Sequence, residues 1–309
     1  MAQSAGLKIG TRGSPLALAQ AREVRASIAA AFSLDPETIE LVVIRTTGDM
    51  VQDRPLTEIG GKGLFTKEID QALIDGAVDL AVHSAKDLPT VLPLELAIIG
   101  YLPREDARDA FISRKAKTLG ELPAGAVVGT ASLRRQAMVK RRRPDLRVAL
   151  FRGNVETRLR KLDEGIVDAT LLAMAGLNRL GREDAVTSVL GIEEFPPAVG
   201  QGAIAVAARG DNDRMRELLR PILDEATGAA LAAERAFLAV LDGSCRTPIA
   251  GHAVVSGDNL KFHGMILRPD GSEELETRRH GDLSQAAALG ADAGTELKNR
   301  APPDFFLHG

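Results

Sequence analysis

The chain has 309 residues, 45% of them hydrophobic and 26% charged, and a formal net charge of −3. This length predicts two or three domains, and the balanced charge argues against a dedicated nucleic-acid binder. The single cysteine excludes an internal disulfide and fits a reducing compartment. Residues 1–6 contain no basic segment followed by an apolar run, so we expect no secretory signal. No apolar stretch is long enough to span a bilayer.

The first strand and helix of the chain are predicted at its start. Residues 7–11 read as a strand, and a helix is expected from Pro15 to about Phe32, with Ser14 as its N-cap. The turn between them directs backbone N–H groups and Arg12 toward one spot, which suits an anion. The buried face of the helix is predicted from apolar residues at three- and four-residue spacing, namely Ala17, Ala21, Val24, Ile28 and Ala31.

A glycine-rich loop follows a second predicted strand at residues 40–45. The loop, at 59–65, contains Lys62 and Phe65. It is not a P-loop, because no Ser or Thr follows the lysine and the glycine spacing differs. A helix is expected at 66–75.

The third predicted strand, residues 78–82, is mostly apolar. Four polar residues follow it directly: His83, Ser84, Lys86 and Asp87. These side chains would lose hydration if they were buried without partners. A hydrogen-bonded strand end with a solvated tail is one interpretation. We favour a cleft, because active sites of open α/β sheets lie at the carboxyl ends of their strands.

A second α/β unit is predicted after a strand at 94–99 and a polar connection at 101–106. Its strands are expected at 127–130, 147–151 and 169–173. Ser132 is placed to cap a helix that carries Arg134 and Arg135, and Arg152 precedes a helix that carries Arg158. The basic run at 140–143 lies farther along its helix and is predicted to be a mostly solvated face.

The remaining segments complete the predicted fold class. A Pro/Gly break at 195–202 returns the chain to the first lobe through a strand at 203–207, and helices are expected at 211–223 and 229–241. Short strands from 251 onward and a helix at 283–299 predict a small domain. The expected fold is α/β, with two lobes around a cleft and a small α+β C-terminal domain.

The predicted ligand follows from one sequence pattern that occurs four times. In this pattern a strand ends in a turn rich in Arg or Lys, and a capped helix follows the turn. Arginine binds carboxylates and phosphates in a bidentate manner, so the expected ligand is a polyanion. No metal is expected, because no HExxH or paired Cys/His spacing is present. No GxGxxG follows the first strand, and no GxSxG is present. Cys245 remains open between a buried apolar residue and a reactive thiol that serves as nucleophile or attachment point.

Seven motifs, in the same order along the chain, resemble the porphobilinogen deaminase (hydroxymethylbilane synthase) family. Any one of them alone would be modest support, whereas the ordered set is specific. They lie at residues 11–17 (TRGSPLA), 60–65 (GGKGLF), 83–89 (HSAKDLP), 129–136 (GTASLRRQ), 152–155 (RGNV), 197–202 (PAVGQG) and 243–245 (GSC).

The resemblance implies three domains and one polypeptide per molecule. Domain 1 would comprise residues 1–103 with 202–224, domain 2 residues 104–201, and domain 3 residues 225–309. Domains 1 and 2 would have the topology of type II periplasmic binding proteins, and domain 3 would carry the cysteine. The family is cytoplasmic and monomeric, with neither nucleic acid nor membrane as a partner.

The chemistry implied by the resemblance is a polymerisation. One dipyrromethane cofactor per chain would be attached to Cys245 through a thioether. Four porphobilinogen molecules would be added to it head to tail, each with release of ammonia. Hydrolysis would then free the linear tetrapyrrole hydroxymethylbilane, in the pathway to haem.

The resemblance also implies the site residues. Asp87 would be catalytic, accepting hydrogen bonds from pyrrole N–H groups and stabilising the positive charge that develops as ammonia leaves. Lys62 and Phe65 would belong to a loop that covers the cleft. The cofactor would be held by Ser84, Lys86, Thr130, Ser132, Arg134 and Arg135, and the substrate by Arg12, Ser14, Arg152, Arg158, Gln201 and Gly202.

Two positions depart from the family pattern. Glu58 stands where a basic residue is common, and Ala207 stands where a glutamate is common. A positive contact at position 58 is therefore in doubt.

Two other classes of protein fit parts of the sequence. A two-lobed solute-binding protein would have the same anion cleft, but no signal peptide is expected here, and that class gives no reason for the presence of Cys245 and Asp87. A thiol hydrolase would need a histidine aimed at Cys245, and nothing in the sequence places His83 or His252 there.

Overall fold

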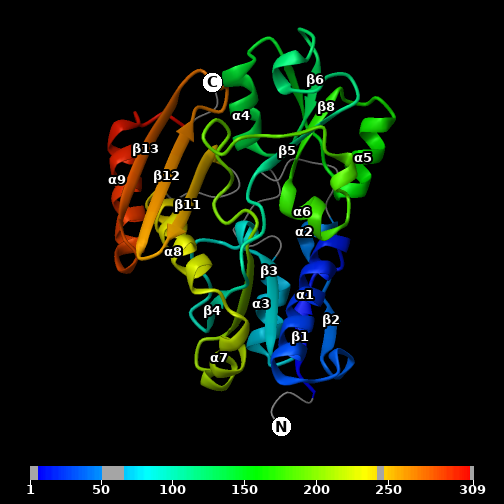
Figure 1. The fold of residues 1–309 in the computed structure, drawn as a ribbon, viewed down its shortest axis with the longest axis vertical. Coiled ribbons are helices and arrows are strands. Elements are labelled where there is room, and N and C mark those ends of the chain that lie inside the picture. The colour runs from blue at the N-terminus through cyan, green and yellow to red at the C-terminus, as the bar shows by residue number, and fades with distance from the viewer. Residues whose placement is uncertain (1–5, 51–65, 242–246, 307–309) are drawn as a thin grey trace. The chain divides into compact units, whose positions relative to one another are not determined.

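The computed structural model describes residues 6–50, 66–241 and 247–306, which fall into two compact units (Figure 1). The first unit contains the described residues up to Glu105 together with 203–228. The second contains 106–202 and the described residues from 229 onward. The chain thus passes between the units after Glu105, Gly202 and Gly228. The division into three domains at the boundaries given above remains a prediction.

The first unit is built on a five-stranded sheet in the order β2-β1-β3-β10-β4. Strand β1 is parallel to β2 and β3, whereas β10 is antiparallel to β3 and β4. The predicted strand at 78–82 lies two residues later, so His83 and Ser84 belong to the strand itself. The strands are β1 (Lys8–Thr11), β2 (Glu40–Val43), β3 (Leu80–Ser84), β4 (Leu96–Tyr101) and β10 (Ile204–Arg209).

Helices cover both faces of this sheet, because the buried strands alternate apolar side chains between two cores. Leu80 and Val82 belong to the core beneath α1, whereas Ala81 belongs to the core beneath α3. The predicted buried face of α1 is confirmed except at Ala31, which is exposed while Ala29 is buried. The helices are α1 (Pro15–Phe32), α2 (Thr47–Met50), α3 (Lys67–Ile74) and α7 (Asp213–Leu219).

The second unit contains a sheet of the same design, in the order β7-β6-β8-β5-β9. Strand β6 is parallel to β7 and β8, and β5 is antiparallel to β8, as β10 is to β3 in the first unit. The sequence analysis did not predict β5 or β9. The strands are β5 (Asp109–Ser113), β6 (Val127–Gly129), β7 (Arg147–Ala149), β8 (Ala169–Ala173) and β9 (Ser188–Val189).

Three helices accompany this sheet: α4 (Leu133–Arg142), α5 (Val155–Asp163) and α6 (Met174–Arg179). Ser132 caps α4 by accepting from the N–H of Arg135, and Asn154 caps α5 by accepting from Thr157. Both helix starts were predicted. They place the turns of residues 130–132 and 152–154 at the carboxyl ends of β6 and β7.

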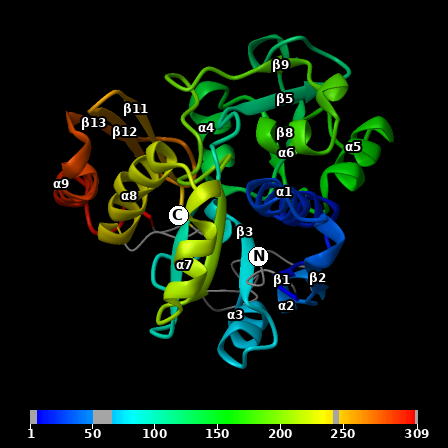
Figure 2. The same ribbon diagram turned by 60° about the horizontal axis from the view of Figure 1, so that its bottom comes forward.

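The second unit also contains a three-stranded antiparallel sheet. Phe262 on one face packs against Phe237 of α8 with ring centroids 5.0 Å apart, and Figure 2 shows α8 and α9 along this sheet. Met265 on the other face shares a core with Met138 of α4. The predicted α/β lobes and small α+β part are confirmed. The elements are β11 (Ile249–Ser256), β12 (Asn259–Leu267), β13 (Glu274–Asp282), α9 (Ala286–Arg300) and α8 (Glu225–Val240), whose first turn up to Gly228 belongs to the first unit.

Within the described parts of the chain, no helix combines the length and apolar character needed to cross a membrane.

Helices α8 and α9 approach so closely that only glycine fits at position 290. A Cβ there would lie 1.9 Å from the carbonyl oxygen of Ala233. We therefore expect Gly290→Ala to lower the free energy of unfolding by about 3 kcal/mol, measured by urea denaturation. The matched control is Gly191→Ala, because a Cβ at Gly191 meets nothing within 4 Å. Equal stability of the two variants would contradict the close packing.

Candidate functional site

The first group of predicted site residues lies at the ends of β1 and β3, in the first unit. These strands are parallel neighbours, so their carboxyl ends meet at one edge of the sheet. The ends line a small pocket of about 60 Å³. Its lining combines predicted residues with two that were not predicted, Gln20 and Thr66. The predicted ones are Arg12, Ser14, Ser84 and Asp87, and His83 lines it as well.

Gln20 reaches this pocket from the second turn of α1. Its side chain is buried, and its Oε1 accepts a hydrogen bond of 3.0 Å from the Ser84 hydroxyl. Ser84 is therefore held in place by the helix that follows Ser14. A polar residue three positions after Ala17 on the apolar stripe was the signal that could have identified Gln20.

His83 is the buried polar group of this pocket. It is 5% exposed, and its Nε2 has no hydrogen-bond partner among the described residues. Burial, and secondarily the positive charge of Arg12, lower the pKa of His83 to about 4. The imidazole is therefore neutral at neutral pH.

Asp87 and Lys86 lie in a single 3₁₀ turn directly after β3, at Ala85–Asp87. Asp87 is exposed at the rim of the pocket and Lys86 is partly buried. The turn is tied to the sheet by a hydrogen bond of 2.9 Å from the N–H of Ala85 to the carbonyl of Ala203. A carboxylate is thus presented to solvent next to the hydrogen-bond donors of the pocket.

The second group of predicted residues lies in the second unit, at the ends of β6 and β7. Thr130 is buried, and its Oγ1 accepts from the N–H of Ser132 at 3.1 Å. Arg158 donates from Nε to the carbonyl of Gly153 at 2.9 Å. Burial and the neighbouring charges of Arg135 and Arg152 lower the pKa of Arg158 to about 10.

Because the charges of Arg135 and Arg152 contribute to this lowered pKa, both arginines lie near enough to Arg158 to repel it. Like positive charges that are partly shielded from water are stabilised by an anionic partner. Arg135 and Arg152 thus lie near Arg158 within this unit, and their shared role in binding an anion stays a prediction. The expected convergence of both groups on one cleft remains a prediction.

Arg134 and Arg135 share the carboxylate of Asp109, a residue that sequence reasoning missed. Each guanidinium lies 2.7 Å from a different carboxylate oxygen. Gln201 joins them through its Nε2, which donates to Asp109 at 2.8 Å and to the carbonyl of Ala107 at 2.8 Å. Gln201 therefore binds the protein through its amide nitrogen.

A further arginine beside the predicted residues was also missed. Arg179, the last residue of α6, donates to the carbonyl of Gly202 at 3.1 Å. No turn motif precedes it in the sequence, and only the fold brings α6 to the segment at 197–202.

The basic run at residues 140–143 differs from its prediction as a mostly solvated face. Lys140 donates to the carbonyl of Leu146, and Arg143 donates to the carbonyls of Leu119 and Leu122. Arg142 lies over the ring of Phe195. These side chains hold neighbouring segments of the second unit, because long cationic side chains can donate hydrogen bonds to backbone carbonyls.

Several predicted residues lie outside the described part of the chain: Glu58, Lys62, Phe65 and Cys245. In the part that is described, no group of three or more His, Cys, Asp or Glu side chains is arranged to hold a metal ion.

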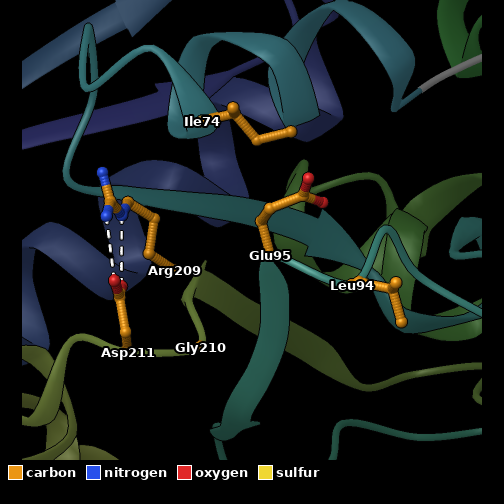
Figure 3. A pocket seen from close by; sticks show the side chains of 6 residues that line it. All are labelled: Ile74, Leu94, Glu95, Arg209, Gly210 and Asp211. Atoms are coloured by element: carbon orange, nitrogen blue, oxygen red, sulfur yellow. Dashed lines mark hydrogen bonds and ion pairs between the residues drawn. The ribbon is translucent and has the colours of Figure 1, made fainter.

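A larger pocket, of about 290 Å³, lies elsewhere on the first unit (Figure 3). Arg209 and Asp211 form an ion pair of 2.9 Å at its edge, and Glu95 and Leu94 line it. No predicted site residue belongs to it. The ion pair already balances the charge of the arginine, so this pocket does not share the cationic character of the arginine group.

The fold and these groups define a class of protein: α/β units that carry arginines and hydrogen-bond donors at the ends of their strands. Residues 7–217 match the family model described as "Porphobilinogen deaminase, dipyromethane cofactor binding domain", and residues 229–299 match the model of the "Porphobilinogen deaminase, C-terminal domain". The chain belongs to the porphobilinogen deaminase family.

Curated relatives support the same family. The proteins named "Porphobilinogen deaminase" from Nitrobacter hamburgensis and Nitrobacter winogradskyi are each 61% identical to this chain over 298 residues. In both cases the match covers 96% of this chain and 94% of the relative.

Solved structures with a similar fold are more distant. One is a periplasmic substrate-binding protein of an ABC transporter from Coxiella burnetii, with 16% identity and a TM-score of 0.44 over 70% of this chain and 91% of that one. Another is the periplasmic VFT2 domain of BvgS from Bordetella pertussis, with 16% identity and a TM-score of 0.42 over 76% of this chain and 94% of that one.

Dipyrromethane is the cofactor of this family, and the described residues suit it. The clustered charges of Arg135, Arg152 and Arg158 call for carboxylates, which a dipyrromethane with acetate and propionate arms supplies. Cys245, the one cysteine of the sequence, is the thiol available for covalent attachment.

The lowered pKa of His83 predicts a specific loss of stability in acid. The unfolded chain takes up a proton at this residue below pH 6.5, whereas the folded protein does so only near pH 4. Stability is therefore lost as the pH falls from 6.5 toward 4, by about 2 kcal/mol at about pH 4.5. We expect His83→Gln to remove this part of the loss, measured as urea unfolding at about pH 7 and about pH 4.5.

The control for this measurement is His280→Gln, because His280 is exposed on β13. It should lose as much stability in acid as the wild type. An identical acid loss in the His83→Gln variant and the wild type would show that His83 is not held neutral.

Proposed function

We propose that this protein is the transferase that joins four porphobilinogen molecules head to tail on its dipyrromethane cofactor. Each addition releases one molecule of ammonia, and hydrolysis frees hydroxymethylbilane for tetrapyrrole biosynthesis. Family membership over nearly the whole chain supports the reaction. The cofactor supplies the pyrrole ring to which the first substrate is joined.

The observation that carries the proposal is the burial of Arg158 beside the positive charges of Arg135 and Arg152, which repel it. A growing pyrrole chain gains two carboxylates with every unit, so it is the kind of polyanion that relieves this repulsion. We assign Arg152 and Arg158 to substrate carboxylates, and Arg135 with Thr130 and Ser132 to the cofactor. Arg134 belongs with Arg135 by resemblance.

The residues of the first unit would handle the reacting ring. Asp87, exposed at the pocket rim, would accept hydrogen bonds from pyrrole N–H groups and stabilise the positive charge that forms as ammonia leaves. It could also take the proton that the ring carbon loses when the new bond forms. Arg12, Ser14, Ser84 and Lys86 would bind carboxylate arms beside it.

The remaining assignments follow the resemblance and complete the proposal. Cys245 would tether the cofactor by a thioether and make no bond to incoming substrate. Lys62 and Phe65 would lie on the covering loop, and Gln201 and Gly202 would lie near the rings. We propose a cytoplasmic monomer that binds neither nucleic acid nor membranes.

The intact mass of the purified protein tests the proposal directly. We expect a mass above that of the bare sequence by one dipyrromethane, and stepwise increments when porphobilinogen is added. Cys245→Ser should show the bare mass, because the attachment is lost. A wild-type protein with the bare mass after incubation with porphobilinogen would overturn the assignment. The alternative of an anion-binding solute-binding protein predicts that result.

Asp87→Asn tests the chemical role of the carboxylate. The change keeps the size of the side chain and its place on the surface, so we expect an unchanged unfolding midpoint. Turnover of porphobilinogen should fall by about 100-fold or more, because a charge that stabilises the transition state is lost. Asp258→Asn, in the exposed turn before β12, is the control and should retain wild-type turnover. Near-normal activity of Asp87→Asn would remove Asp87 from the mechanism.

A further inference from the structure

We propose that Glu234, on α8, positions the return segment, residues 197–202, for substrate binding. The small α+β part of the protein would then serve the reaction in a second way, besides providing Cys245. Glu234 is a positioning residue in this inference, because it acts through the return segment and not on the substrate. The inference rests on the proposed function, which places Gln201 and Gly202 of this segment near the rings.

The return segment lies against the edge of the small sheet. Strand β11 is an edge strand, so alternate N–H groups along it point away from β12. The N–H of Gly251 donates to the carbonyl of Pro197 at 3.0 Å, and the N–H of Ala253 donates to Oε1 of Glu234 at 2.8 Å. The return segment and one side chain of α8 therefore cover this edge.

The other carboxylate oxygen of Glu234 binds the return segment itself. Oε2 accepts from the N–H of Gly200 at 2.7 Å, and the Glu234 side chain is fully buried. A buried N–H that loses its acceptor costs about 1–3 kcal/mol, since no water takes its place. One carboxylate thus links Gly200 to β11 through two backbone N–H groups.

The N–H that Glu234 binds belongs to a tight turn that leads into Gln201. The N–H of Gln201 donates to the carbonyl of Ala198 at 3.0 Å, and Gly200 has a φ of +75°. This is the pattern of a type II turn, in which the third residue needs a positive φ. Because Glu234 binds this third residue, it fixes the direction in which the chain leaves the turn.

Different groups hold the two parts of the return segment. The side chain of Gln201 and the carbonyl of Gly202 bind residues of β5, α6 and the connection before β5. The turn before them binds Glu234 and Gly251, which belong to the small α+β part. Loss of Glu234 should therefore displace the turn and misplace the two residues that follow it.

Glu234→Met tests this contact in the holoenzyme, after intact mass has shown that the cofactor is attached. Methionine has a side chain of similar length but is only a weak acceptor, so both N–H groups lose their partner. We expect KM for porphobilinogen to rise at least fivefold, with kcat changed less than threefold. Hydrogen exchange in the return segment should become at least tenfold faster than in the wild type, while exchange in β12 is unchanged.

The control for this variant is Thr277→Val, in the same α+β part. It removes the buried hydrogen bond of 2.7 Å from Thr277 to Glu296, so it lowers the stability of this part without touching the return segment. Its KM should equal that of the wild type. A smaller rise in KM for Glu234→Met, or an equal rise for Thr277→Val, would overturn the positioning role.

A second comparison decides the matter if Glu234→Met does not fold. An added Cβ would lie 3.0 Å from Cγ2 of Val199 at position 251, and 3.1 Å from Cδ1 of Leu289 at position 281. Gly251→Ala and Gly281→Ala therefore crowd two strands of one sheet alike, but only the first pushes on the return segment. We expect KM to be at least threefold higher for Gly251→Ala than for Gly281→Ala. A smaller difference would contradict the inference.

The wild-type enzyme separates this inference from the proposed function. If the wild type consumes porphobilinogen and the variants do not differ from their controls, only the role of Glu234 is wrong. If the wild type does not consume porphobilinogen, the proposed function is wrong.

Discussion

The ion pairs of the buried Asp109 carboxylate are the interaction on which the second unit most depends. The carboxylate balances two guanidinium groups that have almost no contact with water, and removal of such a charge typically costs about 3–5 kcal/mol. The same carboxylate holds an amide from the return segment at 197–202. Without this carboxylate, Arg134 and Arg135 would repel each other within one helix turn. The start of β5 would also lose the side chain that binds it to neighbouring polar groups.

Local signals predicted much of the fold. Ser14, Ser132 and Asn154 begin α1, α4 and α5 because each side chain accepts a backbone N–H of the first helical turn. Such capping depends on residues that are neighbours in the sequence. The turns that carry Arg12, Ser132 and Arg152 were therefore placed correctly, and with them much of the candidate site.

Most of the misses concern contacts between residues far apart in the sequence. Strand β5 begins with a charged residue and pairs antiparallel with β8, about 60 residues later, and nothing local shows that Asp109 is buried. The contacts of Gln20 with Ser84 and of Arg179 with Gly202 depend on the fold in the same way. Lys140 and Arg143 were predicted to be solvated, because their acceptors are backbone carbonyls that a sequence does not place.

The two units use one strand order but carry different charged groups at their strand ends. In the second unit, burial and the nearby charges of Arg135 and Arg152 lower the pKa of Arg158, a state that favours polyanions. The first unit keeps His83 neutral and exposes Asp87 at its pocket rim. A carboxylate that must stabilise a developing cation would be neutralised if it lay among the arginines, as Asp109 is. In the proposed function, Asp87 of the first unit would stabilise the cation and the arginines of the second unit would bind the anionic chain, so the two roles fall on strand ends of different sheets.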